Sequence, residues 1–163
     1  MILRQLPLIS LIAGLFFLQV MFTASLRLLG IQADLLLVFI LIWAYLRGAA
    51  PGALMGMLCG LLVDVTSSGL FLHTFSYAAI GFLIGALRDN FWGKGIWMMM
   101  GLGFFGTAAV RTIEMLLLWG THKYWVSPFI STLVAGLSNA LAAAVLALPC
   151  LAVIGEPLDE DDR

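Results

Sequence analysis

Long apolar segments alternate with short polar ones along most of this chain. The apolar segments are Leu6–Leu26, Leu35–Leu46, Ala49–Val63, Leu70–Leu87, Ile96–Trp119 and Pro128–Ile154. Because a helix of about 20 apolar residues crosses the hydrocarbon core of a bilayer, this pattern predicts an all-α integral membrane protein, a compact bundle of about six transmembrane helices. Residues 1–155 are expected to form a single polytopic membrane domain, and residues 156–163 an acidic cytoplasmic tail.

The composition points to a membrane environment and excludes other classes. Hydrophobic residues make up 63% of the 163 residues and charged residues 10%, with a mean hydropathy of +1.09. Soluble domains are about 45–50% apolar and about 25% charged, so neither a soluble enzyme nor a disordered chain fits. The net charge of −1 offers no basic face to nucleic acid. Cys59 and Cys150 lie in apolar segments and are expected to be buried thiols.

The first apolar segment and the positive charges indicate an orientation. A signal peptide is the alternative for Leu6–Leu26, because Thr23-Ala24-Ser25 is a stretch of small residues, but the segment exceeds the usual length of about 7–15 apolar residues. We therefore expect a retained helix. Cytoplasmic loops are enriched in Lys and Arg. With both termini inside, the inner segments hold Arg4, Arg47, Arg88, Lys94 and Arg163, and the outer loops hold Arg27 and Lys123.

Small residues recur every fourth position in two neighbouring segments. The third segment carries Gly52, Gly56, Gly60 and then Asp64, and the fourth carries His73, Tyr77, Gly81 and Gly85. Four residues advance about 400° around a helix, so each set forms one stripe. Small residues allow close helix contact in lipid, and the two segments are expected to form a tight hairpin, with Asp64 level with His73 and Gly56 facing Gly81. Alternatively, one stripe receives a helix from another protein.

Charged residues inside the apolar segments are the candidate polar site. Arg111 and Glu114 lie in the fifth segment, and Asp34, Asp64 and His73 are expected at the same side of the membrane. A charge at the bilayer centre costs about 2.5–3.5 kcal/mol on insertion scales, so these groups need partners. Arg111 and Glu114 can pair along their own helix at i, i+3. The five residues can form a structural network, a ligand or partner site, or a path for protons or ions.

Motifs for catalysis, metals and nucleotides are missing from the sequence. There is no HxxH or CxxC metal spacing and no phosphate-binding GxxxxGK[ST]. Ser67, Ser68 and Ser131 have no nucleophile-elbow motif around them. We therefore expect no catalytic residues, no metal and no cofactor, and we expect that the protein is not an enzyme.

The segment from Ala33 to Gly85, about a third of the chain, resembles the rod shape-determining protein MreD family. The residues that carry the resemblance are Ala33-Asp34-Leu35-Leu36-Leu37, Gly52, Gly56, Gly60-Leu61-Leu62-Val63-Asp64, Leu72-His73, Tyr77 and Gly81-Phe82-Leu83-Ile84-Gly85. The family often has Pro where this chain has Ala33, and often has Gly where this chain has Phe71.

The resemblance implies a non-catalytic component of the bacterial cell-wall elongation machinery in the inner membrane. It implies binding of the transmembrane helix of MreC and, through MreC, association with MreB, RodA and the transpeptidase of RodA. It also implies a fold similar to the substrate-binding subunits of energy-coupling-factor transporters. The alternative function is therefore a substrate-binding subunit of a small-molecule uptake transporter, and homodimerisation through a glycine stripe stays open.

Overall fold

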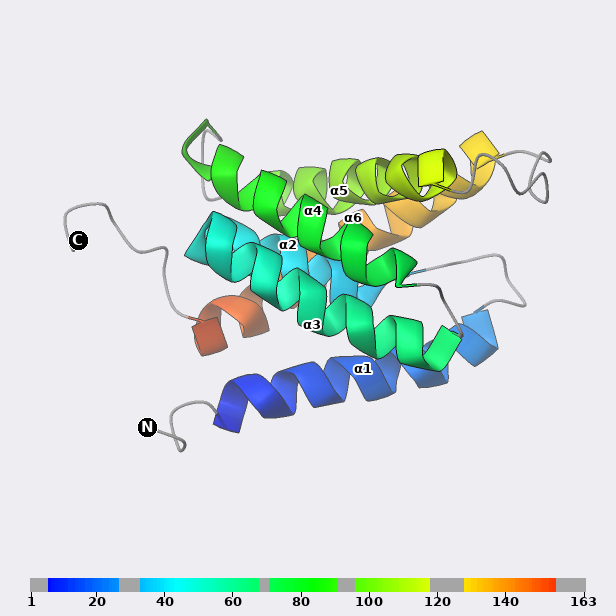
Figure 1. Cartoon of the computed structure of the whole chain (residues 1–163). Helices are drawn as coiled ribbons and strands as arrows, with labels where there is room; N and C mark the ends of the chain where they lie inside the picture. Colours follow the sequence, from blue (N-terminus) through cyan, green and yellow to red (C-terminus); the bar gives the residue numbers. More distant parts are fainter. Residues whose placement is uncertain (1–5, 27–32, 68–70, 91–95, 118–127, 155–163) are drawn as a thin grey trace.

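Helices account for nearly all of the chain that the computed structural model describes, namely residues 6–26, 33–67, 71–90, 96–117 and 128–154 (Figure 1). They are α1 (Leu6–Leu26), α2 (Leu35–Arg47), α3 (Ala49–Ser67), α4 (Leu72–Leu87), a short 3-10 turn (Arg88–Asn90), α5 (Ile96–Leu117) and α6 (Pro128–Ile154). No strand occurs in these ranges, which confirms the all-α prediction. The acidic tail, and the charges at Arg4, Arg27, Lys94, Lys123 and Arg163, lie outside them.

The helix α2 is the centre of the bundle. Every side chain from Leu36 to Ile42 is at most 1% exposed, and α2 contacts each of the other five α-helices. A helix that is apolar all round is a buried helix, and the LLLVFILI sequence of α2 meets that condition. With 13 residues α2 is about 20 Å long, so it is shorter than the hydrocarbon core that it is predicted to cross.

A single residue, Gly48, separates α2 from α3. Gly48 has φ +92°, which is unfavourable for residues with a side chain. Its N–H donates to the carbonyl oxygen of Ala44 at 2.8 Å, and its own carbonyl accepts from Gly52 at 2.9 Å. Both backbone polar groups of Gly48 are therefore paired at the point where the chain reverses between the two helices.

The helices α3 and α4 form the tight hairpin predicted from the glycine stripes (Figure 1). A Cβ atom at Gly52 would lie 2.5 Å from the Gly81 carbonyl oxygen, and one at Gly60 would lie 2.5 Å from the Cα of Thr74. A Cβ at Gly56 would collide with the Tyr77 carbonyl group. The two backbones thus touch directly along the stripe, which only residues without a side chain allow.

The register of this hairpin differs from the prediction by one helical turn. Gly56 faces Tyr77, not Gly81, and Gly85 faces Gly48 instead of Gly52. The difference arises because Asp64 caps the first turn of α4: its carboxylate reaches the N–H groups of His73 and Thr74, and its contact with His73 is kept.

The helix of the third apolar segment was predicted to end with that segment, before Asp64, and the structure shows that this is wrong. The helix α3 continues through Ser67, because the Thr66 hydroxyl donates to the Leu62 and Val63 carbonyl oxygens at 3.2 and 2.9 Å. These bonds satisfy carbonyl groups of the last turn. Asp64 therefore sits within the last turn of α3.

The outward faces of the bundle are apolar. Three described helices are long and apolar enough to span a membrane: Ala49–Thr66, Ile96–Leu117 and Ile130–Leu151. Large hydrophobic side chains on them point away from the core, among them Val65 at 77%, Phe105 at 71% and Val145 at 73% exposure. So much exposed apolar surface is costly in water and favourable in lipid.

Candidate functional site

The first turn of α2 begins inside the bundle, and side chains from three parts of the chain satisfy its backbone groups. The Asp34 carboxylate accepts from the Leu37 N–H at 3.0 Å, as an N-cap residue does. The Gln19 side chain of α1 accepts from the Leu36 N–H at 2.9 Å. The Asn139 side chain of α6 accepts from the Asp34 N–H at 2.7 Å. An unsatisfied N–H in lipid would cost several kcal/mol, so these bonds allow α2 to start below the bundle surface.

Hydrogen bonds extend this arrangement to α4 and α5. The Tyr77 hydroxyl donates to Asp34, and the Asn139 amide donates to the Thr107 hydroxyl at 2.8 Å. Thr107 in turn donates to the carbonyl oxygen of Gly103 at 2.6 Å. Tyr77, Asn139 and Thr107 are all buried. One connected set of polar groups therefore ties α2 to α4, α5 and α6.

Asp64 supplies the N-terminal cap of α4 from the neighbouring helix. Its two carboxylate oxygens accept from the backbone N–H groups of His73 at 3.2 Å and Thr74 at 2.8 Å. The Thr74 hydroxyl donates to the same carboxylate at 2.6 Å. The residue at the N-cap position of α4, Phe71, makes no side-chain cap and has the left-handed φ of +56°. An acidic group at this place also interacts favourably with the helix dipole.

His73 lies between two carboxylates. Its Nδ1 is 2.9 Å from Asp64, and its Nε2 is 3.7 Å from Glu114 Oε1. The other oxygen of Glu114 is 4.0 Å from the Arg111 guanidinium, which confirms the predicted i, i+3 contact. The chain of groups Asp64–His73–Glu114–Arg111 therefore runs from α3 across α4 to α5.

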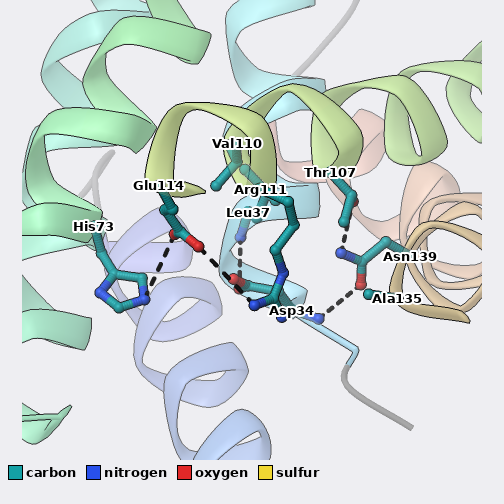
Figure 2. A pocket seen from close by; sticks show the side chains of 9 residues that line it. All are labelled: Asp34, Leu37, His73, Thr107, Val110, Arg111, Glu114, Ala135 and Asn139. Carbon is teal, nitrogen blue, oxygen red and sulfur yellow. Dashed lines mark hydrogen bonds and ion pairs between the residues drawn. The ribbon is translucent and has the colours of Figure 1, made fainter. Parts of the chain in front are cut away.

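A small polar cavity collects these groups (Figure 2). Its volume is about 60 Å³, and its polar lining includes Asp34, His73, Arg111, Glu114 and Asn139. Figure 2 shows Glu114 between His73 and Arg111, with Asp34 close below them. The five residues of the predicted polar cluster thus come together, four in the cavity wall and Asp64 behind His73. The cavity has room for a few water molecules.

In the part of the chain that the structure describes, no group of three His, Cys, Asp or Glu side chains is placed to hold a metal ion.

The hydroxyl oxygen of Ser76 in α4 is buried and has no hydrogen-bond partner. Ser76 does not line the cavity.

The glycines predicted to bind a partner helix all pack against other parts of the same bundle. Gly52, Gly56 and Gly60 contact α4, Gly81 contacts α3, and Gly85 contacts the Gly48–Ala49 peptide. A second helix cannot occupy these faces while the hairpin is closed. The alternative that a glycine stripe receives a helix from another protein therefore does not fit this structure.

Several site residues escaped the sequence reasoning. Gln19, Thr107 and Asn139 are uncharged polar residues within apolar segments and were not predicted as site residues. Tyr77 was predicted only as a member of the stripe in the fourth segment, not as a partner of Asp34, and Thr74 was not predicted. A buried amide or hydroxyl in a predicted membrane helix is the signal that could have marked Gln19, Thr107 and Asn139.

Fold and site together define an all-helical protein with helices suited to a membrane and an interior network of paired polar groups. Comparison of the chain with family models, with curated proteins and with solved structures gave no match.

Proposed function

We propose that this chain is a non-catalytic scaffold with six transmembrane helices in the bacterial inner membrane. In this proposal its termini are cytoplasmic and it binds the transmembrane helix of MreC, which links it to MreB, RodA and the transpeptidase of RodA. The resemblance of Ala33–Gly85 to the MreD family supports the choice of partner. The observation that carries the scaffold role is the division of the molecule: polar groups pair with one another inside, and apolar side chains cover the outside.

The size of the cavity favours a scaffold over an uptake subunit. Small-molecule sites usually measure about 300–1,000 Å³, whereas this cavity measures about 60 Å³. The groups around it are also bonded to each other: Asp34 to Tyr77, and His73 to Asp64. A nutrient would have to open the bundle and break these bonds before it could bind.

The glycine faces are occupied, so a partner helix has to bind an outward face. One candidate is the stripe of α3 formed by Leu54, Leu58, Leu61 and Val65, all of which are exposed and spaced for one side of a helix. The other two described helices long enough to span a membrane, α5 and α6, also expose apolar faces, marked by Phe105 and Val145. Packing against any of them would rely on van der Waals contact, which drives helix association in lipid.

Site-specific photo-crosslinking in cells that contain MreC tests the proposal. A crosslinking residue is placed at Leu58, Phe105 or Val145, one on each outward face, and at buried Ile40 as the matched control. We expect a crosslink to MreC from one face and none from Ile40. Intact protein that gives no MreC crosslink from any face would contradict the proposal. A nutrient retained in the native mass spectrum of the purified protein would support the transporter alternative instead.

A further inference from the structure

The contact between α4 and α5 includes ionisable groups at the end of the bundle where α4 begins. There Nε2 of His73 lies 3.7 Å from Oε1 of Glu114. The cavity lies beside this contact and is lined from both helices. A change of charge at this contact would therefore act between α4 and α5.

The hydrogen-bond partners of Asp64 show which ring nitrogen of His73 carries a hydrogen. Asp64 accepts from two backbone N–H groups and from the Thr74 hydroxyl, and it lies at the positive end of the α4 dipole. These donors favour the ionised carboxylate, which can only accept. The 2.9 Å contact between Asp64 and His73 consequently needs a hydrogen on Nδ1 of His73.

The other ring nitrogen then determines the charge of the site. With Nδ1 protonated, neutral His73 presents the Nε2 lone pair towards Glu114, and an ionised Glu114 would repel it. A proton on Nε2 replaces this repulsion with an ion pair, which the low dielectric of the interior strengthens. At 3.7 Å the contact is too long for a hydrogen bond, so a charge on the ring would act through ion pairing.

Charged groups from three other helices surround His73. Among the residues that the structure describes, they are Asp64 from α3, Asp34 at the start of α2, and Glu114 and Arg111 from α5. The ring of Tyr77, on α4 itself, lies edge-on with its centroid 5.8 Å away and is neutral. In this described set, three carboxyl groups and one guanidinium lie around the imidazole ring.

We propose that His73 and Glu114 form a proton-binding site that holds α4 against α5. When the site takes up a proton from the surrounding water, the imidazolium lies between Asp64 and Glu114 and the two helices are held together. When the proton returns to water, the Nε2 lone pair faces the Glu114 carboxylate and the helices separate at this end. This goes beyond the proposed scaffold role and does not depend on the identity of the partner.

Nitrogen-15 NMR of histidine-labelled protein in lipid nanodiscs tests the first step. The chain has two histidines, so a His122→Gln variant leaves His73 as the single labelled ring. We expect ring shifts of an imidazolium at about pH 5 and of the Nδ1–H tautomer at about pH 9, a range that covers histidine titration. An Nε2–H tautomer, or a neutral ring throughout, would overturn the proposal.

Distances between spin labels test the second step. One label pair joins Phe75→Cys on α4 to Met115→Cys on α5, and the control pair joins Phe75→Cys to Val65→Cys on α3; all three positions are exposed, and native Cys59 and Cys150 are buried. We expect the α4–α5 distance to lengthen between about pH 5 and pH 9, while the α3–α4 distance stays constant.

Two carboxylate-to-amide variants separate the site from general effects of pH. Glu114→Gln is expected to remove the pH dependence of the α4–α5 distance. Asp89→Asn changes an exposed carboxylate paired with Arg88 outside the cluster, and it should leave the pH dependence intact. An unchanged distance in the parent chain, or an equal pH response in Glu114→Gln, would overturn the proposal. The NMR measurement tests it independently if Glu114→Gln does not fold.

Discussion

The two sides of α4 are built in opposite ways. Towards α3, backbone meets backbone through Gly52, Gly56 and Gly60. Towards α5, His73 faces Glu114 across 3.7 Å beside the polar cavity. The glycine stripe on the α3 side leaves no room for a side chain, whereas the α5 side leaves space for a few waters. The comparison shows that one helix can have a fixed face and an adjustable face, and each can be tested with a different kind of substitution.

The largest effect is expected where the fixed face is broken. Gly56→Leu places a side chain against the Tyr77 carbonyl group, and we expect a loss of stability of about 3 kcal/mol or more, the upper range for overpacked cores. Reversible unfolding in detergent measures it. The matched control is Gly101→Leu in α5, because a Cβ at Gly101 has nothing within 4 Å. Equal losses in both variants would show that α3 and α4 do not depend on the glycine contact.

The cap between α3 and α4 is the next test. Asp64→Ala removes the acceptor for two backbone N–H groups, the Thr74 hydroxyl and the His73 ring. A lost cap costs about 1 kcal/mol and one buried donor left without a partner about 1–3 kcal/mol. Water can serve the other donors, because His73 is partly exposed, so we expect a total loss of about 2–4 kcal/mol. Hydrogen exchange should also become faster in the first turn of α4. Unchanged exchange at His73 and Thr74 would show that Asp64 is not their cap.

A smaller loss is expected at the cavity, where Asn139 of α6 bonds to the start of α2 and to α5. Asn139→Leu keeps the size of the side chain but removes the bonds to the Asp34 N–H and the Thr107 hydroxyl. Water in the cavity can accept from the freed N–H, because Asp34 lines it. Hydrogen bonds between membrane helices contribute about 0.6 kcal/mol on average, so two of them give a loss of about 1 kcal/mol in the same unfolding measurement. Ser138→Ala, whose hydroxyl bonds only within α6, should be neutral. A loss for Ser138→Ala as large as that for Asn139→Leu would contradict this assignment.

The smallest effect is a gain in stability at the start of α4. Phe71 has φ +56° and an exposed side chain, and the left-handed conformation costs an ordinary residue about 1–2 kcal/mol. Phe71→Gly should therefore stabilise the protein by about 0.5–1 kcal/mol after the added flexibility of the unfolded chain is subtracted. The same substitution at Phe75, which is helical and exposed, should destabilise it. Destabilisation by both would show that the conformation of Phe71 carries no strain.

The fixed face was largely predictable from the sequence, because its signal is local. Glycines four residues apart on two adjacent segments predicted the hairpin, and the structure confirms it. The register was wrong by a turn, since it depends on how the Asp64 side chain reaches over the end of α4. The spacing of residues along one helix does not show which N–H groups of the next helix a side chain will contact.

The adjustable face was predictable only in part. Asp34, Asp64, His73, Arg111 and Glu114 were singled out because charge is rare in apolar segments, and the structure brings them together. Their neutral partners were not identified, since the bond between Asp34 and Asn139 joins residues 105 positions apart. A single Asn or Gln in an apolar segment does not indicate which of several helices it will meet.

The separation between Asp34 and Asn139 has a consequence for biosynthesis. Ribosomes add about 5–20 residues per second, so about 5–20 seconds pass between the synthesis of Asp34 and that of the side chain which accepts its N–H. During this delay α3 and α4, which also enclose α2, are already made, but the acceptor that α6 provides for the Asp34 N–H is missing. The start of α2 therefore stays incompletely bonded, or bonded to water, until the last helix has been made.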